Sequence, residues 1–168
     1  IERGDFSESP PKGYFRLFPG NTVRLRHGYV VKCTGCDKDN DGNVIAVHCE
    51  YFPDSRSGTP GADNYKVKGN IHWVCAKSAG QARVHLYDRL FRVEHPGRDR
   101  DVLEDLNPDS RTTITARIEP ALGTAVASEC FQFERHGYFT LDRESQSNAP
   151  VFNRTVTLRD GWAKQKKK

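Results

Sequence analysis

Residues 33–52, CTGCDKDNDGNVIAVHCEYF, contain a dense group of potential metal ligands. The segment opens with Cys33 and Cys36 in a Cys-x-x-Cys arrangement and closes on the neighbours His48 and Cys49. Thiolates and imidazoles at such spacings hold structural zinc, whereas the alternating aspartates of DKDNDG have the pattern of a calcium-binding loop. Three interpretations are therefore open: a zinc site, a calcium site, or a tight turn between two strands.

Neither metal fits the segment well. If a calcium loop began at Asp37, its twelfth position, which requires a bidentate glutamate, would be His48. In a strand, His48 and Cys49 point to opposite faces, so a fourth zinc ligand would have to come from elsewhere, such as Cys75. The flanking segments GYVVKC and NVIAVHC alternate in hydropathy like strands. We therefore expect no metal site and predict a β-hairpin whose turn is formed by residues 41–43, DGN.

The same alternation of apolar and polar residues runs through most of the chain, which predicts strands rather than helices. It recurs in TVRLRHGYVVKC, YKVKGNIHWVC, ARVHLYDRLF, TTITARIE, CFQFERHGYFTL and VFNRTVTLRD. Glycine, proline and asparagine separate these runs, and short helices are expected only around AKSAGQ and DVLEDLN. The pattern predicts an all-β chain of antiparallel strands, in a sandwich or barrel, with a soft boundary near residues 94–101.

Composition and motifs limit the classes of function. The chain has 168 residues, a formal net charge of +4 and five cysteines, and it begins without a methionine. Because the first residue is not methionine, we expect the chain to be a fragment of a longer protein. We expect that protein to be cytoplasmic with free thiols, because we find no secretory signal and no apolar run long enough to span a membrane. We also find no phosphate-binding loop and no nucleophile elbow, so we expect no catalytic site.

Cationic and amide side chains lie on the polar faces of several predicted strands. Arg24 and Arg26 share a face, and Arg16 lies between two apolar residues just upstream. The same holds for Lys66 and Lys68 near Trp73, and for Gln132, Glu134 and Arg135 in FQFER. Arginine and glutamine read base edges, and aromatic rings stack on unpaired bases. RNA binding is therefore one interpretation; the other is that these charges solvate the outside of a barrel.

FQFERHGYFTLD and PVFNRTVTLRDGW resemble the C-terminal anticodon-binding region of class I glutaminyl-tRNA synthetases. YFRLFPGNTVRLRHGYVVKC, KVKGNIHWV and YDRLFRVEHPG extend the resemblance from about residue 5 to residue 164. It implies two antiparallel β-barrels: a distal one over 11–91, and an incomplete proximal one from 1–10 and 92–164. Residues 165–168 would form a basic tail.

The resemblance also assigns roles to individual residues. It implies that Arg24 reads the first anticodon base, Gln132 the central uracil and Arg16 the third base. The supporting residues, which orient these readers or contact phosphate, would be Arg26, Glu134 and Arg135. Phe15 departs from the pattern, since the residue before Arg16 is lysine in some family members.

The implied parent is a glutamine–tRNA ligase that uses ATP and Mg²⁺ in translation, while this chain supplies recognition without catalysis or a cofactor of its own. Its expected partners are the anticodon loop of the glutamine tRNA and the catalytic domain of the same polypeptide, in a cytoplasmic monomer. Three alternatives remain open from the sequence: the same domain of a glutamyl-tRNA synthetase, a ribosomal-RNA-binding β-barrel protein with a similar, ribosomal protein L25-like fold, and a metal-stabilised structural or interaction domain.

Overall fold

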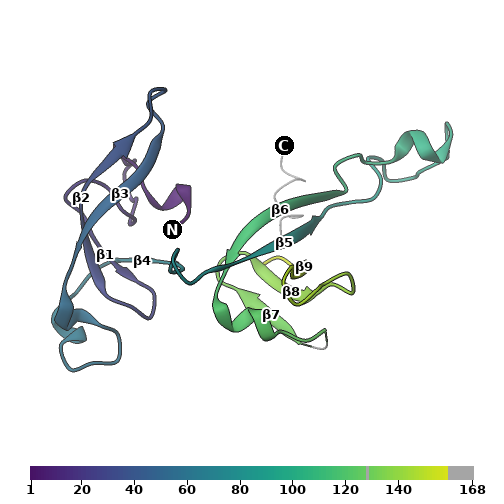
Figure 1. The fold of residues 1–168 in the computed structure, drawn as a ribbon. Coiled ribbons are helices and arrows are strands. Elements are labelled where there is room, and N and C mark those ends of the chain that lie inside the picture. The colour runs from purple at the N-terminus through teal and green to yellow at the C-terminus, as the bar shows by residue number, and fades with distance from the viewer. Residues whose placement is uncertain (128, 159–168) are drawn as a thin grey trace. The chain divides into compact units, whose positions relative to one another are not determined.

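The computed structural model describes residues 1–127 and 129–158, which form strands joined by loops and short 3₁₀ helices (Figure 1). The chain divides into two compact units, one from Ile1 to Trp73 and one from Val74 onward. The prediction of an all-β chain is confirmed. Among the described residues, no helix has the length and hydropathy needed to cross a bilayer.

The first unit contains one four-stranded sheet in the order β3-β2-β1-β4. Its strands are β1 (Thr22–Leu25), β2 (Val30–Lys38), β3 (Val44–Tyr51) and β4 (Gly69–Ile71), and its 3₁₀ helices are η1 (Arg3–Asp5), η2 (Pro53–Ser55) and η3 (Ala62–Asn64). β1, β2 and β3 pair antiparallel, whereas β4 pairs parallel to β1. The parallel pair is possible because the long connection 52–68 returns the chain to the end of the sheet at which β1 starts.

The segment rich in potential metal ligands forms the β2–β3 hairpin, as the alternation predicted. Gly42 adopts a positive φ of 81° in the turn. The Asp39 carboxylate accepts hydrogen bonds from the backbone N–H groups of Asp41 (3.0 Å) and Asn43 (2.7 Å). The bond from Asn43 is the main reason that the pKa of Asp39 lies below its usual value. The acidic run therefore builds a turn.

The second unit contains a five-stranded sheet in the order β6-β5-β9-β8-β7. Its strands are β5 (Gly80–Tyr87), β6 (Arg111–Ile118), β7 (Cys130–Phe133), β8 (Gly137–Leu141) and β9 (Val151–Val156), with η4 (Val102–Asp105) and η5 (Pro120–Thr124) in the connections. β5 and β9 are parallel, and the other neighbours are antiparallel. Neither sheet closes on itself within the part of the chain that the structure describes.

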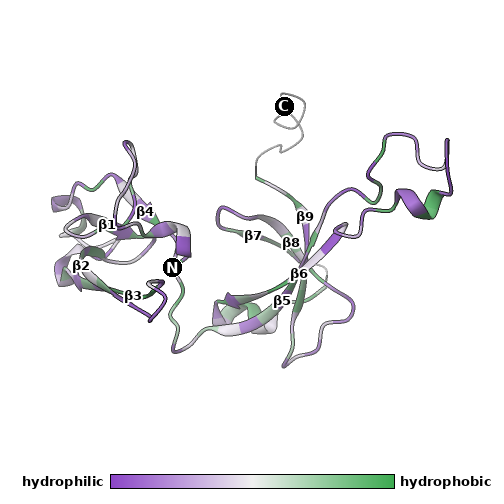
Figure 2. Cartoon of the chain, turned by 90° about the horizontal axis from the view of Figure 1, so that it is seen from above, coloured by the Kyte–Doolittle hydropathy of each residue, from purple (hydrophilic) through white to green (hydrophobic). Residues whose placement is uncertain are grey.

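Each unit has its own apolar core. In the first, Leu17, Val23, Val31, Cys33 and Ile71 are buried together. In the second, the buried cluster consists of Ala82, Val84, Ile118, Phe139 and Phe152. In Figure 2 the strands change between hydrophobic and hydrophilic colours along their length, in line with the alternation that predicted them.

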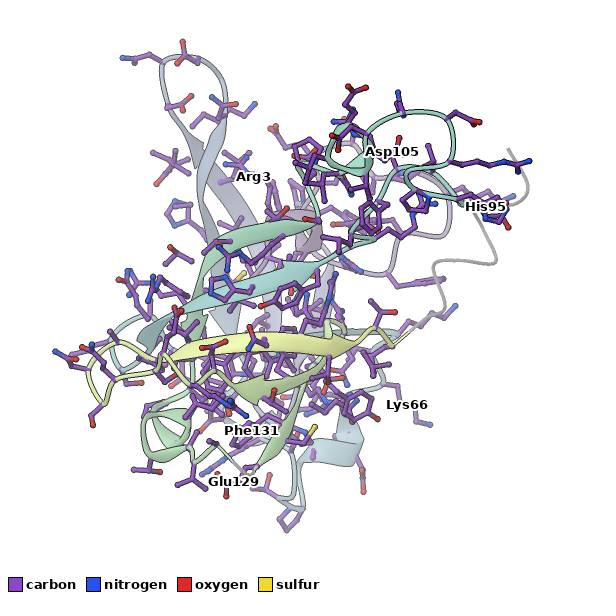
Figure 3. The ribbon with its side chains drawn as sticks, turned by 90° about the vertical axis from the view of Figure 1, so that its right-hand side faces the viewer. Arg3, Lys66, His95, Asp105, Glu129 and Phe131 are labelled. Carbon is purple, nitrogen blue, oxygen red and sulfur yellow. The ribbon has the colours of Figure 1, made fainter. Side chains whose placement is uncertain are left out.

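The long connection between β5 and β6, residues 88–110, extends beyond the sheet (Figure 1). Asp105, at the end of η4, organises it (Figure 3). Its buried carboxylate accepts hydrogen bonds from the Gly97 N–H (2.9 Å) and from Arg100 Nε (2.5 Å). The Gly97 bond, more than Arg100, lowers the pKa of Asp105. The second helix expected from the sequence, around AKSAGQ, is a turn in which Ser78 and Ala79 donate to the Cys75 carbonyl.

The division between the units lies at a different point from the barrel boundary expected after residue 91. β5 was placed in the distal barrel, yet it pairs with β6 and β9 of the second unit. The expected proximal barrel includes residues 1–10, yet Phe6 forms a bridge with Leu17 and the Leu17 N–H donates to the Asp5 carbonyl. Alternation identifies a strand from local sequence, but the partner of that strand depends on distant residues.

Candidate nucleic-acid interface

Arg24, near the end of β1, is held by the connection between β3 and β4. Its Nη1 donates to the Ser55 carbonyl (2.6 Å) and weakly to Ser57 Oγ (3.4 Å), and its Nη2 donates to the Ala62 carbonyl (2.9 Å). Backbone carbonyls fix the plane of the guanidinium without neutralising its charge. The guanidinium is therefore held in one orientation beside β4, with both of its Nη atoms already donating to the protein.

An open pocket of about 520 Å³ lies beside this guanidinium. It is lined by Arg24, Tyr65, Lys66, Val67, Lys68, Gly69 and Asn70. Lys66 and Lys68 bring two further cations to the pocket beside Arg24, and Asn70 adds an amide. Lys66, labelled in Figure 3, is exposed on the first unit. Three cations, one amide and one phenol suit a ligand with a phosphate and hydrogen-bonding edges, as a nucleotide has.

Arg16 takes part in a different arrangement, at the N-terminal turn. Its Nη1 donates to the Gly4 carbonyl (2.9 Å) and lies 3.1 Å from Asp5 Oδ1. The Asp5 side chain is completely buried, whereas 38% of the Arg16 side chain is exposed. The ion pair therefore fixes the Nη1 edge of the Arg16 guanidinium, while part of the side chain stays accessible to a ligand.

Arg26 follows β1 and is exposed. Its backbone is tied down, because its N–H donates to the Ile71 carbonyl (2.9 Å) and its own carbonyl accepts from Trp73 Nε1 (3.0 Å). The next residue, His27, has a positive φ of 57°. The chain turns sharply here, so Arg26 extends from a defined position close to the end of β1.

Gln132, Glu134 and Arg135 belong to the β7–β8 hairpin of the second unit. Gln132 is exposed on β7, while its neighbours Phe131 and Phe133 face the core, as the alternation predicted. The Phe133 ring stacks on Phe139 with centroids 4.3 Å apart. Glu134 lies in the turn with Arg135, which adopts a positive φ of 66°. The aromatic packing therefore fixes the strand that presents Gln132.

Apart from Arg26, which follows β1, the residues selected from the sequence lie in three places. Arg24 shares its pocket with Lys66 and Lys68, Arg16 lies at the N-terminal turn, and the β7–β8 residues lie in the other unit. Sequence reasoning did not select Tyr65 and Asn70, which also line the pocket. The available signal was YKVKGN, where an aromatic and an amide flank two alternating lysines.

The cysteines that suggested zinc are arranged as strand residues. Cys33 is buried and lies directly opposite Cys49, while Cys36 lies opposite Val47. Loss of hydration, followed by the neighbouring Cys33 thiol, raises the pKa of Cys49 to about 11, which favours the protonated form over the thiolate that zinc requires. Across residues 1–127 and 129–158, no three His, Cys, Asp or Glu side chains form a group that could hold a metal ion.

Replacing Ser55 with alanine is expected to destabilise the first unit by about 2 kcal/mol. The buried Ser55 Oγ accepts from the Val30 N–H (2.8 Å) and donates to the Phe52 carbonyl (2.6 Å), so alanine leaves a buried N–H without this partner. Urea denaturation measures the change. Thr59→Ala, which removes an exposed hydroxyl from the same connection, is the matched control and should change stability by less than about 0.5 kcal/mol. Equal effects of the two substitutions would contradict this assignment.

Comparison with known proteins matches two segments of the chain to one description. Residues 1–52 and residues 70–142 each match a family model for the anticodon-binding domain of class I tRNA synthetases (E and Q). Among curated proteins, the chain is 62% identical over 166 residues to a glutamine–tRNA ligase of Ralstonia nicotianae and equally identical to one of Cupriavidus metallidurans. A glutamine–tRNA ligase of Bordetella pertussis is 60% identical over 164 residues.

These alignments cover 96–98% of this chain but only 28–29% of the relatives. The chain therefore spans less than a third of the length of the curated relatives that it matches. The two family matches and the high identity to synthetases along nearly the whole chain agree with the all-β structure and with the cationic pocket. The chain belongs to the anticodon-binding domains of the class I tRNA synthetases for glutamate and glutamine.

Proposed function

We propose that this chain recognises the anticodon of the glutamine tRNA, as part of a glutamine–tRNA ligase. The observation that carries the proposal is the identity of 60% or more to glutamine–tRNA ligases along nearly the whole chain. The pocket at Arg24 supports it with suitable chemistry, because it combines fixed donors, positive charge and an amide on one surface. The metal-stabilised alternative has no comparable support.

In this proposal the three anticodon bases are unstacked and read separately. Arg24 donates to the edge of the first base, Gln132 to that of the central uracil and Arg16 to that of the third base. Arg26, Glu134 and Arg135 orient these readers or contact phosphate. Arg24 and Arg16 enter the complex with their guanidinium groups already oriented by Ser55, Ala62 and Asp5, which lowers the entropy cost of binding.

We assign the ATP- and Mg²⁺-dependent attachment of glutamine to the catalytic part of the parent ligase, with which this domain would act as a cytoplasmic monomer. Contacts to the anticodon, far from the reacting groups, would help to orient the acceptor end of the tRNA. The chain's own residues bind and discriminate, and they take no part in bond making.

The family description includes glutamate as well as glutamine enzymes, so the test compares both tRNAs. Fluorescence anisotropy would measure binding of the chain to anticodon stem-loops with glutamine, glutamate and unrelated anticodons at one fixed salt concentration. We expect the glutamine stem-loop to bind most tightly. Tightest binding of the glutamate stem-loop would favour a glutamyl-tRNA synthetase, and equal binding of all three would contradict anticodon recognition.

Replacing Lys166, Lys167 and Lys168 with alanine should weaken binding of all stem-loops by the same factor and flatten the dependence of affinity on salt. These residues lie outside the described part of the chain, and the expectation rests on their charge alone. Titrations at several salt concentrations measure the slope. A loss that differed between anticodons would contradict the assignment of the tail to phosphate attraction.

A further inference from the structure

Phe15 is a large apolar side chain on the surface of the first unit. Its side chain is 55% exposed. By contrast, the side chains on either side of it, Tyr14 and Arg16, both donate hydrogen bonds to the Gly4 carbonyl. The Nζ atom of Lys68 lies over the Phe15 ring, 5.7 Å from the centroid, within the range of a cation–π contact. The ring is therefore accessible at the surface and lies next to a positive charge.

The backbone places Phe15 beside the pocket at Arg24. The Phe15 carbonyl approaches β4 so closely that a Cβ added to Gly69 would lie 2.3 Å from its oxygen. Gly69 and Lys68 both line the pocket. One lysine therefore contacts the ring and the pocket together, and Phe15 stands at the pocket's rim.

The side chains before and after Phe15 point elsewhere. The Tyr14 hydroxyl and Arg16 Nη1 both donate to the Gly4 carbonyl, at 3.1 and 2.9 Å. The Phe15 ring lies at Lys68 instead. The two positions flanking Phe15 thus anchor the segment to the N-terminal turn, and the ring between them is directed toward the cationic pocket.

We propose that Phe15 is a stacking platform for one unstacked base of the bound RNA, whose phosphate or base edge is held by Arg24, Lys66 or Lys68. Lys68 lies over the ring, and more than half of the side chain is exposed, so a base has room to stack on it. A nucleotide suits this surface because its base stacks on the ring while its phosphate meets the cations of the pocket. The inference rests on the proposed RNA-binding function and adds to it a contact that is tolerant of base identity.

The test uses Phe15→Leu, which keeps an apolar side chain but removes the aromatic ring, and Phe15→Trp, which enlarges the ring. Tyr51→Leu is the matched control, since Tyr51 is 60% exposed in the same unit but pairs with Tyr29 and does not line the pocket. The probe is a glutamine anticodon stem-loop with 2-aminopurine at each anticodon position in turn, because its fluorescence is quenched by stacking. Thermal denaturation checks that each variant is folded.

We expect Phe15→Leu to weaken binding by about 5- to 150-fold, and by the same factor for all four bases at the stacked position. It should also remove the quenching of 2-aminopurine at that one position, whereas Phe15→Trp and Tyr51→Leu should retain both. If Phe15→Leu binds and quenches like the wild type while Arg24→Ala binds weakly, the platform is refuted and the proposed function stands. If the wild type binds no stem-loop, both are refuted.

Discussion

Replacing Arg24 with alanine is expected to weaken binding of a glutamine anticodon stem-loop by about 5- to 150-fold, the range for loss of one good bidentate contact to a base. The loss should depend on the first anticodon base, because the fork that reads it has been removed. Titration of stem-loops that differ only at this base measures the effect. The same substitution removes donors to the Ser55 and Ala62 carbonyls, so stability should also fall by about 2 kcal/mol.

Two further variants distinguish recognition of the base from the general effect of positive charge on binding. Arg24→Lys keeps the charge but has a single ammonium group, so it should retain affinity for phosphate and lose discrimination at the first base. Lys32→Ala removes an exposed positive charge from β2, outside the pocket, and should change binding only slightly. If Lys32→Ala and Arg24→Ala reduced binding equally for every anticodon, Arg24 would be one charge among many and not a base reader.

Replacing Arg16 with alanine is expected to lower the stability of the first unit by about 2–3 kcal/mol, because it removes the guanidinium that is paired with the buried Asp5 carboxylate. Asp5 also accepts a bond from the Glu2 N–H (3.2 Å), which softens the loss but cannot replace the positive charge. Urea denaturation of the single variants and of the pair measures the coupling.

The double variant Arg16→Ala/Asp5→Asn completes this double-mutant cycle and shows whether the two side chains interact. Asparagine removes the buried negative charge that Arg16 balances, so the double variant should be more stable than Arg16→Ala alone. Additive effects would mean that the two side chains do not interact. In binding, Asp5→Asn should weaken discrimination at the third base less than Arg16→Ala does, because it disturbs the orientation of the reader without removing it.

Much of the local structure could be predicted from the sequence. Alternation of apolar and polar residues predicted that Phe131 and Phe133 face inward while Gln132 faces outward, and this is confirmed. The DGN turn was predicted because few residues adopt the positive φ found at Gly42. Both features depend on residues close together in the chain, where steric preferences and burial act on the same few positions.

The long-range arrangement could not be predicted in the same way. The parallel pairing of β1 with β4 depends on how residues 52–68 cross the unit, and the assignment of β5 depends on β6 and β9. Arg24 was expected as an exposed reader on a strand face, but its guanidinium is also fixed by carbonyls more than 30 positions away. Hydrogen bonds of this kind leave no signal in local hydropathy.

The most direct test of base-by-base recognition concerns the central anticodon base. Binding of the wild type and of Gln132→Ala would be measured with two stem-loops, one with the central uracil and one with cytosine in its place. The account predicts that the wild type prefers uracil by about 5- to 150-fold and that Gln132→Ala binds both alike, because the discriminating amide is gone. A wild type that binds both stem-loops equally, or a variant that keeps the full preference, would contradict it.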